Sequence, residues 1–279
     1  MLLAAPGTLW VLLLVMSFYL DRPLNFAHQG VSHEAPANTL PAFLLAADMG
    51  ADGIEFDVQL TRDGEVVVIH DFTLDATTNG SGPVSDHTLA ELKMLDAGGW
   101  FDPDFAGEQI PTLQEVIDAV AGRLLFNIEI KIASLRDPGL VEAVVRLVEE
   151  NGLLERVVVS SFNPASLWRV RRRNPAIPIG LLYAPDMPPV LRQAWLRHVV
   201  RPNAMHPYYT TLSPAYVRWA RRCGYQINTW TVDDPGDMWR LVRMGVDVVI
   251  TNRPDVLALV LKAARGRVRP PLPMLPAPR

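Results

Sequence analysis

Four short segments of this 279-residue chain carry side chains that could work together in one active site. They are His28-Gln29-Gly30, Glu55-Phe56-Asp57, His70-Asp71 and Glu129-Ile130-Lys131. Each lies at or near the end of a stretch that is typical of a β-strand. Two histidines, several carboxylates and a lysine suit metal-assisted cleavage of a phosphate ester, because that reaction needs both proton transfer and charge stabilisation.

The acidic residues are spaced so that they face the same way. Glu55 and Asp57 are two positions apart on a predicted strand, and Glu129 and Lys131 repeat that spacing on a later one. Three converging carboxylates would repel one another unless a cation lay between them. Oxygen ligands favour Mg²⁺, Ca²⁺ or Mn²⁺ over Zn²⁺. The alternative is a solvated edge strand, which the bulky apolar neighbours disfavour: Ile54, Phe56, Val58, Ile128 and Ile130.

Two histidines stand out by their positions. His28 and His70 each end an apolar run, and histidine exchanges protons near neutral pH. Phosphodiester cleavage needs a base for the attacking oxygen and an acid for the leaving alkoxide, and this pair could provide both. His206, at the end of another strand-like run, is a weaker candidate. No pattern supports His33, His87 or His198.

Strand and helix patterns alternate along the chain from residue 24 onward. Several strands are apolar on both faces, as a parallel sheet covered by helices requires. With the 53–60 and 65–70 segments joined as one hairpin, the chain makes eight β/α units, which favours a closed (β/α)8 TIM barrel. No glycine-rich phosphate loop follows the first strand, which weighs against an open doubly wound sheet. The expected strands are 24–28, 53–60, 124–130, 157–161, 177–182, 203–206, 225–230 and 247–251, and the expected helices are 39–49, 112–121, 140–150, 164–173, 189–199, 214–223, 237–244 and 255–264.

The barrel is expected to span residues 24–264 and to contain a small insertion at about 73–110. A tail rich in proline and arginine, residues 265–279, is expected to be disordered, with binding to an anionic surface as the alternative.

The first 22 residues form a separate hydrophobic segment. No charged side chain occurs from Met1 to Leu20, and a helix of that length would reach roughly 30 Å, about the hydrocarbon thickness of a bilayer. We therefore expect a single-pass membrane anchor at residues 1–22 and a membrane-associated protein. A cleaved leader is an alternative, although the basic region and the A-x-A site of a leader are missing. A hydrophobic element packed on the domain is another.

Overall charge limits the partners. The net charge of −4 and the pI of about 5.9 are unlike those of a nucleic-acid-binding protein. An anionic substrate would therefore need local positive charge from a metal or from Lys131. The single cysteine, Cys223, excludes an internal disulfide and a cysteine-based metal site.

Taken together, the motifs resemble the signature of the glycerophosphodiester phosphodiesterase family, which is similar to H-R-G, P-E-N-T, E-x-D, T-x-D-G and H-D in that order. The resemblance covers about residues 26–257. The matching segments are His28-Gln29-Gly30, Pro36-Ala37-Asn38-Thr39, Glu55-Phe56-Asp57, Thr61-Arg62-Asp63-Gly64, His70-Asp71, Thr77-Thr78-Asn79-Gly80, Ile110-Pro111-Thr112-Leu113, Glu129-Ile130-Lys131, Asn228-Thr229-Trp230 and Thr251-Asn252-Arg253-Pro254.

The resemblance implies a TIM barrel and metal-dependent hydrolysis of a glycerophosphodiester to an alcohol and sn-glycerol 3-phosphate. It implies one divalent cation, Mg²⁺ or Ca²⁺ with Mn²⁺ as an alternative, at Glu55, Asp57 and Glu129. It also implies His28 and His70 as the acid and base. The substrate would then contact Lys131 and Gln29 near the phosphate and Trp230 at the alcohol, although barrel packing is an equal interpretation of Trp230.

Two positions depart from the family pattern. Gln29 replaces the usual arginine and Ala37 replaces the usual glutamate. Because the paired change leaves the formal charge of the site unaltered, we hypothesise that the family residues form an ion pair that a neutral arrangement replaces here.

Three other functions stay open at this stage. The apolar N-terminal segment makes lysophospholipids plausible substrates, which would give an activity like that of lysophospholipase D. A cyclising lyase, as in related sphingomyelinase D-like barrels, is a second. A catalytically impaired, membrane-tethered barrel is a third, supported only by the two departures.

Overall fold

Eight parallel strands close into a barrel in the computed structural model, which describes residues 18–19 and 22–266. Closure follows from the first strand, β1, which pairs on one side with β2 and on the other with β9. The predicted barrel is therefore confirmed. The strands of the ring are β1 (Leu24–His28), β2 (Gly53–Leu60), β4 (Leu125–Ile130), β5 (Val157–Ser161), β6 (Ile179–Tyr183), β7 (Ala204–Pro207), β8 (Gln226–Thr229) and β9 (Val248–Thr251).

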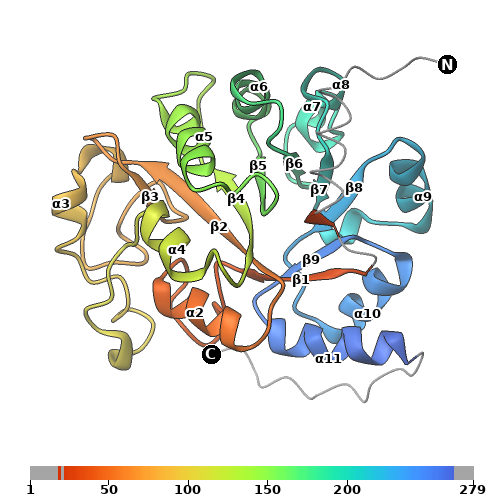
Figure 1. Ribbon diagram of the computed structural model, residues 1–279, viewed down its shortest axis with the longest axis horizontal. Helices are drawn as coiled ribbons and strands as arrows, with labels where there is room; N and C mark the ends of the chain where they lie inside the picture. The colour runs from red at the N-terminus through yellow and green to blue at the C-terminus, as the bar shows by residue number, and fades with distance from the viewer. Residues whose placement is uncertain (1–17, 20–21, 267–279) are drawn as a thin grey trace.

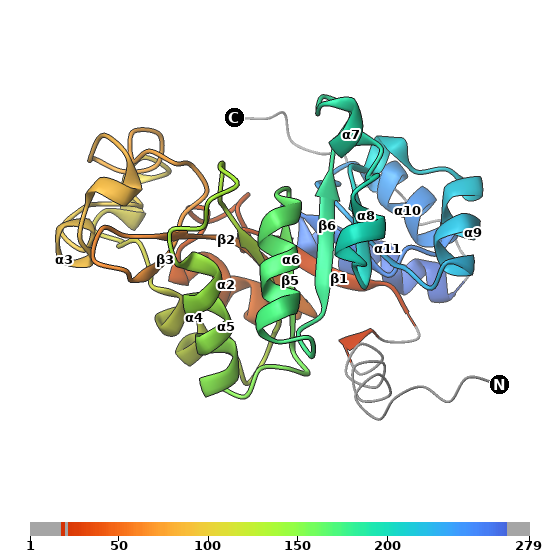
Figure 2. The same cartoon turned by 90° about the horizontal axis from the view of Figure 1, so that it is seen from above.

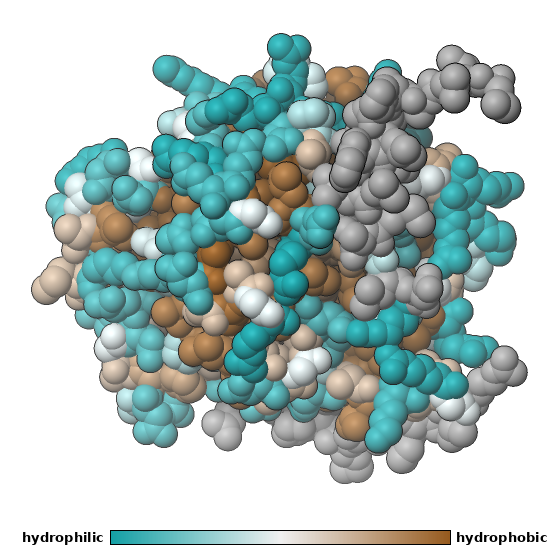
Figure 3. Space-filling model, in the orientation of Figure 1, coloured by the Kyte–Doolittle hydropathy of each residue, from teal (hydrophilic) through white to brown (hydrophobic). Residues whose placement is uncertain are grey.

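Helices cover the outside of the barrel, as Figure 1 shows. Side-chain caps begin several of them; for example, Thr112 and Glu115 form a capping box at α4. On the face seen in Figure 3, hydrophilic residues cover most of the outer parts, and hydrophobic residues show between them and near the centre. The helices are α2 (Leu40–Asp48), α4 (Leu113–Val120), α5 (Leu140–Glu150), α6 (Pro164–Arg173), α7 (Pro189–Arg192), α8 (Arg197–Val200), α9 (Pro214–Arg222), α10 (Pro235–Met244) and α11 (Pro254–Arg265).

A ninth strand, β3 (Val66–Val68), runs antiparallel to β2 and completes the predicted hairpin. The chain between β3 and α4 then forms three short helices, η1 (Val84–Asp86), α3 (Leu89–Leu92) and η2 (Pro103–Phe105). This part of the chain lies to one side of the barrel in Figure 1. It has an apolar cluster of its own, formed by Val67, Ile69, Leu74, Val84, Leu92, Ala97 and Ile110.

Strand register brings the predicted site residues together. His28 on β1 is the direct partner of Glu55 on β2, and Asp57 on β2 is the partner of Glu129 on β4. Neighbouring strands are about 4.8 Å apart, and paired residues of parallel strands point to the same face. The alternate apolar residues, including Phe56 and Ile128, are fully buried. The barrel therefore positions these four polar side chains within contact range.

A polar group fills part of the barrel interior. The His206 side chain is fully buried, and its Nε2 lies 3.0 Å from the Asn228 amide nitrogen. Burial lowers the pKa of His206 to about 3. A side chain on Gly180 would collide with the His206 ring. His206 is therefore a packed interior residue of the barrel, and this geometry gives no support to it as a site candidate.

The predicted membrane anchor at residues 1–22 lies mostly outside the described residues. Three residues within it, Phe18, Tyr19 and Arg22, are described, and Phe18 and Tyr19 are buried against the barrel. The Tyr19 hydroxyl accepts a hydrogen bond of 3.0 Å from Asn228. Among residues 18–19 and 22–266, no helix is long and apolar enough to cross a membrane. The structure therefore gives the anchor no support.

The predicted helix at 189–199 is wrong in its continuity. It divides into α7 and α8, because Ala194 adopts a left-handed conformation with φ of 49°. A left-handed residue cannot continue a right-handed helix.

Candidate active site

A buried acidic triad lies at the carboxyl end of the barrel. Glu55, Asp57 and Glu129 each offer a carboxylate oxygen, and these oxygens lie within 4.8 Å of one another. All three side chains are buried. Burial, together with the charges of Asp57 and Glu129, raises the pKa of Glu55 well above its usual range. Burial and the Asp57 charge likewise raise the pKa of Glu129 to about 7.

One cation of the chain already contacts this triad. The Lys131 ammonium lies 3.1 Å from Glu129 Oε1 and 3.4 Å from Asp57 Oδ1. Burial lowers the pKa of Lys131, but the Glu129 and Asp57 charges outweigh burial and leave that pKa raised. Lys131 is therefore a permanent positive charge beside the carboxylates.

The triad fits a divalent cation. Its three carboxylates and Lys131 sum to a net charge of −2 when all are ionised. One carboxylate oxygen, Glu55 Oε2, is buried and has no hydrogen-bond partner among the described residues. An unpaired buried acceptor is costly unless a ligand satisfies it. The all-oxygen donor set suits Mg²⁺ or Ca²⁺.

Two amide side chains hold the remaining carboxylate oxygen of Asp57. Gln29 Nε2 donates to Asp57 Oδ2 at 2.9 Å, and Asn38 Nδ2 donates to the same oxygen at 3.1 Å. Both amide residues adopt left-handed backbone conformations, with φ of 55° and 61°. These bonds leave Asp57 Oδ1 directed to the triad and Lys131. Gln29, predicted to contact substrate, therefore contacts Asp57 in this structure.

A polar network orients His28. Its Nδ1 lies 2.7 Å from Asn252 Oδ1, which also accepts a hydrogen bond from Ser32. Asn252 Nδ2 donates to Asp233, so its oxygen must face the histidine. Nδ1 therefore carries the proton, and the Nε2 lone pair faces Glu55, whose Oε2 is 3.8 Å away. Burial lowers the pKa of His28, despite the Asn252 contact that raises it.

His70 has a different environment. It follows β3 and is half exposed, and its Nδ1 lies 2.7 Å from Asp71 Oδ1. A carboxylate can only accept from that nitrogen, and it can also pair with a charged imidazolium ring. Gln59 Nε2 donates to the backbone carbonyls of residues 69, 70 and 71, at 2.6 to 3.2 Å. Gln59 therefore fixes the turn that presents His70.

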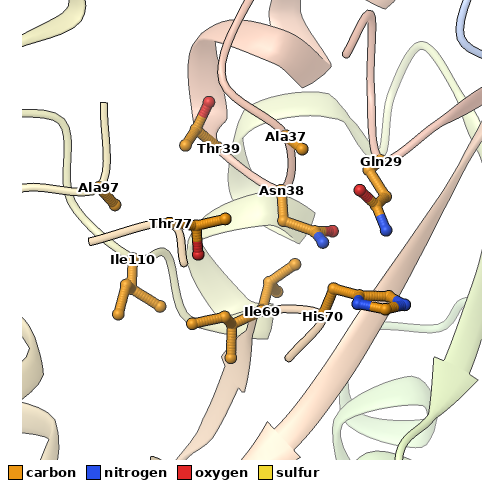
Figure 4. A pocket seen from close by; sticks show the side chains of 10 residues that line it. Gln29, Ala37, Asn38, Thr39, Ile69, His70, Thr77, Ala97 and Ile110 are labelled. Atoms are coloured by element: carbon orange, nitrogen blue, oxygen red, sulfur yellow. The ribbon is translucent and has the colours of Figure 1, made fainter. Parts of the chain in front are cut away.

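A small cavity lies between His70 and the loop that follows β1 (Figure 4). Its volume is about 30 Å³, and Gln29 and Ala37 both line it. The remaining lining residues are Asn38, Thr39, Val68, Ile69, Thr77, Ala97 and Ile110. The two positions that depart from the family pattern thus face the same space.

Trp230 follows β8 at the carboxyl end of the barrel. Its Nε1 donates to the His206 carbonyl oxygen at 2.9 Å. Its ring makes edge contacts with Phe162 and Tyr208, with centroids 5.4 and 5.3 Å away. These contacts favour the packing interpretation of Trp230, while its half-buried ring leaves a surface free for a ligand.

Several site residues escaped the sequence interpretation. Asn38 and Asn252 lie within motifs that match the family, but no role was predicted for them from the sequence. Their position in those motifs was the one feature that could have pointed to a role. Nothing in the sequence pointed to Gln59 or Asp233, because neither belongs to a pattern of spaced polar residues that would predict a site.

Comparisons with known proteins identify the family of this chain. Residues 28–256 match the model of the glycerophosphoryl diester phosphodiesterase family. A glycerophosphodiester phosphodiesterase of Caldanaerobacter subterraneus is 45% identical over 237 residues, which are 85% of this chain and 96% of the relative. One from Bacillus subtilis is 37% identical over 257 residues, 87% of each chain. A solved phosphodiesterase of Oleispira antarctica, in complex with the product sn-glycerol-3-phosphate, has a TM-score of 0.76 and 30% identity, covering 89% of this chain and 99% of that one.

Proposed function

Because the chain belongs to the glycerophosphoryl diester phosphodiesterase family, we propose that the residues described at the barrel mouth carry out its reaction. The protein is a phosphodiesterase that hydrolyses glycerophosphodiesters to an alcohol and sn-glycerol 3-phosphate. The observation that carries the site assignment is the buried triad in register with His28 and in contact with Lys131.

Glu55, Asp57 and Glu129 would hold one divalent cation, Mg²⁺ or Ca²⁺. When bound, such a cation polarises a phosphoryl oxygen and offsets negative charge that develops in the transition state. Lys131 adds a second positive charge at the same place. Gln29 and Asn38 keep Asp57 in position, because both donate hydrogen bonds to its Oδ2.

The two histidines divide the proton transfers. His28 presents an unprotonated Nε2 towards the triad, so it takes the proton of the attacking oxygen. His70 is paired with Asp71 and protonates the leaving oxygen of the alcohol. The oxygen of the attacking water thus forms the new bond to phosphorus, and the bond from phosphorus to the alcohol oxygen breaks.

A hydrolysis assay tests this function. Glycerophosphocholine should give choline and sn-glycerol 3-phosphate in the presence of Mg²⁺ or Ca²⁺, and a chelator should abolish the reaction until the metal is restored. Hydrolysis in water labelled with ¹⁸O should place the label in the phosphate. A cyclic product free of label would instead favour the lyase.

Lysophospholipid cleavage is the less favoured alternative, since the relatives are named for glycerophosphodiesters and one solved relative binds sn-glycerol-3-phosphate. Comparing kcat/KM for glycerophosphocholine and lysophosphatidylcholine decides between them. An impaired barrel is also disfavoured, because all three carboxylates, both histidines and Lys131 are present.

Asn252 should act as a positioning residue for His28. We expect Asn252→Ala to lower kcat by roughly 10- to 100-fold, because His28 Nδ1 loses its acceptor and the ring can take the wrong tautomer. KM for glycerophosphocholine should change much less. Ser32→Ala is the matched control, since it removes another donor to the same Asn252 oxygen without freeing the ring. Equal losses in the two variants would contradict this role.

The neutral pair at Gln29 and Ala37 gives a second prediction. Gln29→Arg alone should not raise activity, because the new guanidinium would lie beside Asp57 and pair with that proposed metal ligand, while Ala37 across the cavity offers no other carboxylate. Gln29→Arg combined with Ala37→Glu should retain activity, because the two groups can pair. Steady-state kinetics of the two variants and of the native protein provide the measurement. A large gain in kcat/KM for the single Gln29→Arg variant would refute the pairing hypothesis.

A further inference from the structure

A second cavity lies outside the barrel, beneath the segment that contains α7 and α8. Its volume is about 210 Å³. Aromatic and apolar side chains make most of its wall. The lining residues are Tyr183, Arg192, Gln193, Ala194, Met205, Thr211, Tyr216 and Trp219. None of them belongs to the proposed active site.

The segment over this cavity exposes large apolar side chains. Val190 is 42% exposed, Trp195 52% and Val199 64%. These three residues follow one another along the two short helices and the bend between them. Burial of large aromatic or aliphatic side chains is favourable, so a surface that leaves three of them exposed gains from a partner.

The charge of the same segment differs from that of the whole chain. Between residues 185 and 201 there are three arginines and one aspartate, whereas the chain carries a net charge of −4. Arg197 is held by the Gln193 and Ala194 carbonyls and by the Trp219 ring. For the Arg192 guanidinium, which lines the cavity and is exposed, the described part of the chain provides no hydrogen bond or ion pair.

We propose that the α7–α8 segment is a docking surface for an anionic phospholipid bilayer. Val190, Trp195 and Val199 enter the interface, where tryptophan is favoured. Arg192 meets the anionic head group, and the cavity receives part of an acyl chain. The basic charge selects an anionic surface, which distinguishes a bilayer from a neutral apolar partner.

This surface has a defined relation to the barrel. Figure 2 shows α7 beyond the arrowhead of β6, at the carboxyl end of that strand. The active-site residues lie at the carboxyl ends of β1, β2 and β4. Docking through α7 therefore brings the mouth of the barrel towards the membrane. The proposal concerns binding alone and does not depend on which reaction the site performs.

Vesicle binding of the full chain tests the proposal. Vesicles of phosphatidylglycerol and phosphatidylcholine should bind the protein more tightly than pure phosphatidylcholine, and less tightly as salt rises. Arg192→Glu should weaken binding to the anionic vesicles roughly tenfold or more, since each basic residue near such a surface contributes about 1 kcal/mol. Trp195→Ala should weaken it by a similar factor. Trp100→Ala is the matched control, because Trp100 is 46% exposed but lies between β3 and α4.

Quenching by brominated phosphatidylglycerol locates the acyl chains. The quenched share of tryptophan fluorescence should fall in Trp195→Phe and in Trp219→Phe, and stay unchanged in Trp100→Phe. If the quenched share fell in Trp195→Phe but not in Trp219→Phe, entry of an acyl chain into the cavity would be refuted. Unchanged binding and quenching in Arg192→Glu and Trp195→Phe would refute the docking surface, even if residues elsewhere attach the protein to vesicles.

Discussion

Glu55→Gln should lower metal-dependent turnover of glycerophosphocholine by about a thousandfold or more. Glu55 is a buried member of the triad beside His28, and its Oε2 has no hydrogen-bond partner among the described residues. The amide keeps the shape of the side chain but removes one negative charge from the proposed metal site. A hard cation prefers charged oxygen ligands, so both affinity and transition-state stabilisation should fall. The measurements are kcat/KM as a function of Mg²⁺ or Ca²⁺ concentration, and the affinity for each metal by calorimetry.

The stability of Glu55→Gln shows whether lost activity reflects lost metal binding or an unfolded protein. Burial raises the pKa of Glu55, so in the metal-free protein the folded state favours its protonated form. For an acid of raised pKa, the folded state holds more protons than the unfolded one above the usual value of 4.5, and stability falls as the pH rises. Glu55→Gln removes this loss and should be at least as stable as the native protein at pH 7. Glu65→Gln, at an exposed site in the hairpin, is the matched control. Normal metal titration in Glu55→Gln would contradict the site.

Much of the site could be predicted because strand geometry is regular. Glu55 and Asp57 alternate with apolar residues, and Glu129 and Lys131 do the same. In a parallel barrel, alternation determines the face and neighbouring strands end together. The spacing of these residues was therefore enough to predict that the three carboxylates and Lys131 lie close together.

The groups that orient the site could not be predicted in the same way. Asn252 reaches His28 across 224 residues, and Asn38 reaches Asp57 from a left-handed position in a loop. Hydrogen bonds of neutral amides leave no charge or periodicity in the sequence. Their partners are determined by loop conformation and barrel closure, which only tertiary structure supplies.

The pattern of hydrophobic residues alone does not determine where a helix breaks or what an apolar segment packs against. Residues 189–199 have helical composition, but left-handed Ala194 divides them. Residues 1–22 are apolar enough to predict an anchor, and most of them lie outside the described residues; Phe18 and Tyr19, which are described, are buried against the barrel, where Tyr19 meets Asn228. Hydrophobicity alone cannot distinguish a lipid-facing side chain from one that packs in a protein interior.

The two histidines give the other large effect. His28→Ala and His70→Ala should each lower kcat/KM for glycerophosphocholine by roughly 10²- to 10⁴-fold, the range expected for loss of a general base or acid. Burial lowers the pKa of His28, so the base stays unprotonated at neutral pH. The rate of the native enzyme should then fall on the acid side only below the ordinary histidine pKa of 6.5. That acid limb should be absent in His28→Ala.

Leaving-group dependence distinguishes the two roles. A 4-nitrophenyl phosphodiester needs little protonation of its leaving oxygen, so His70→Ala should regain most of its activity on that substrate. His28→Ala should not, because attack still requires a base. His87→Ala is the matched control, since His87 lies outside the site and its Nε2 lies 3.2 Å from the Ser81 carbonyl oxygen. Recovery of His28→Ala in place of His70→Ala would reverse the assignment. Recovery of neither would exclude both histidines as the leaving-group acid and place that proton on another residue.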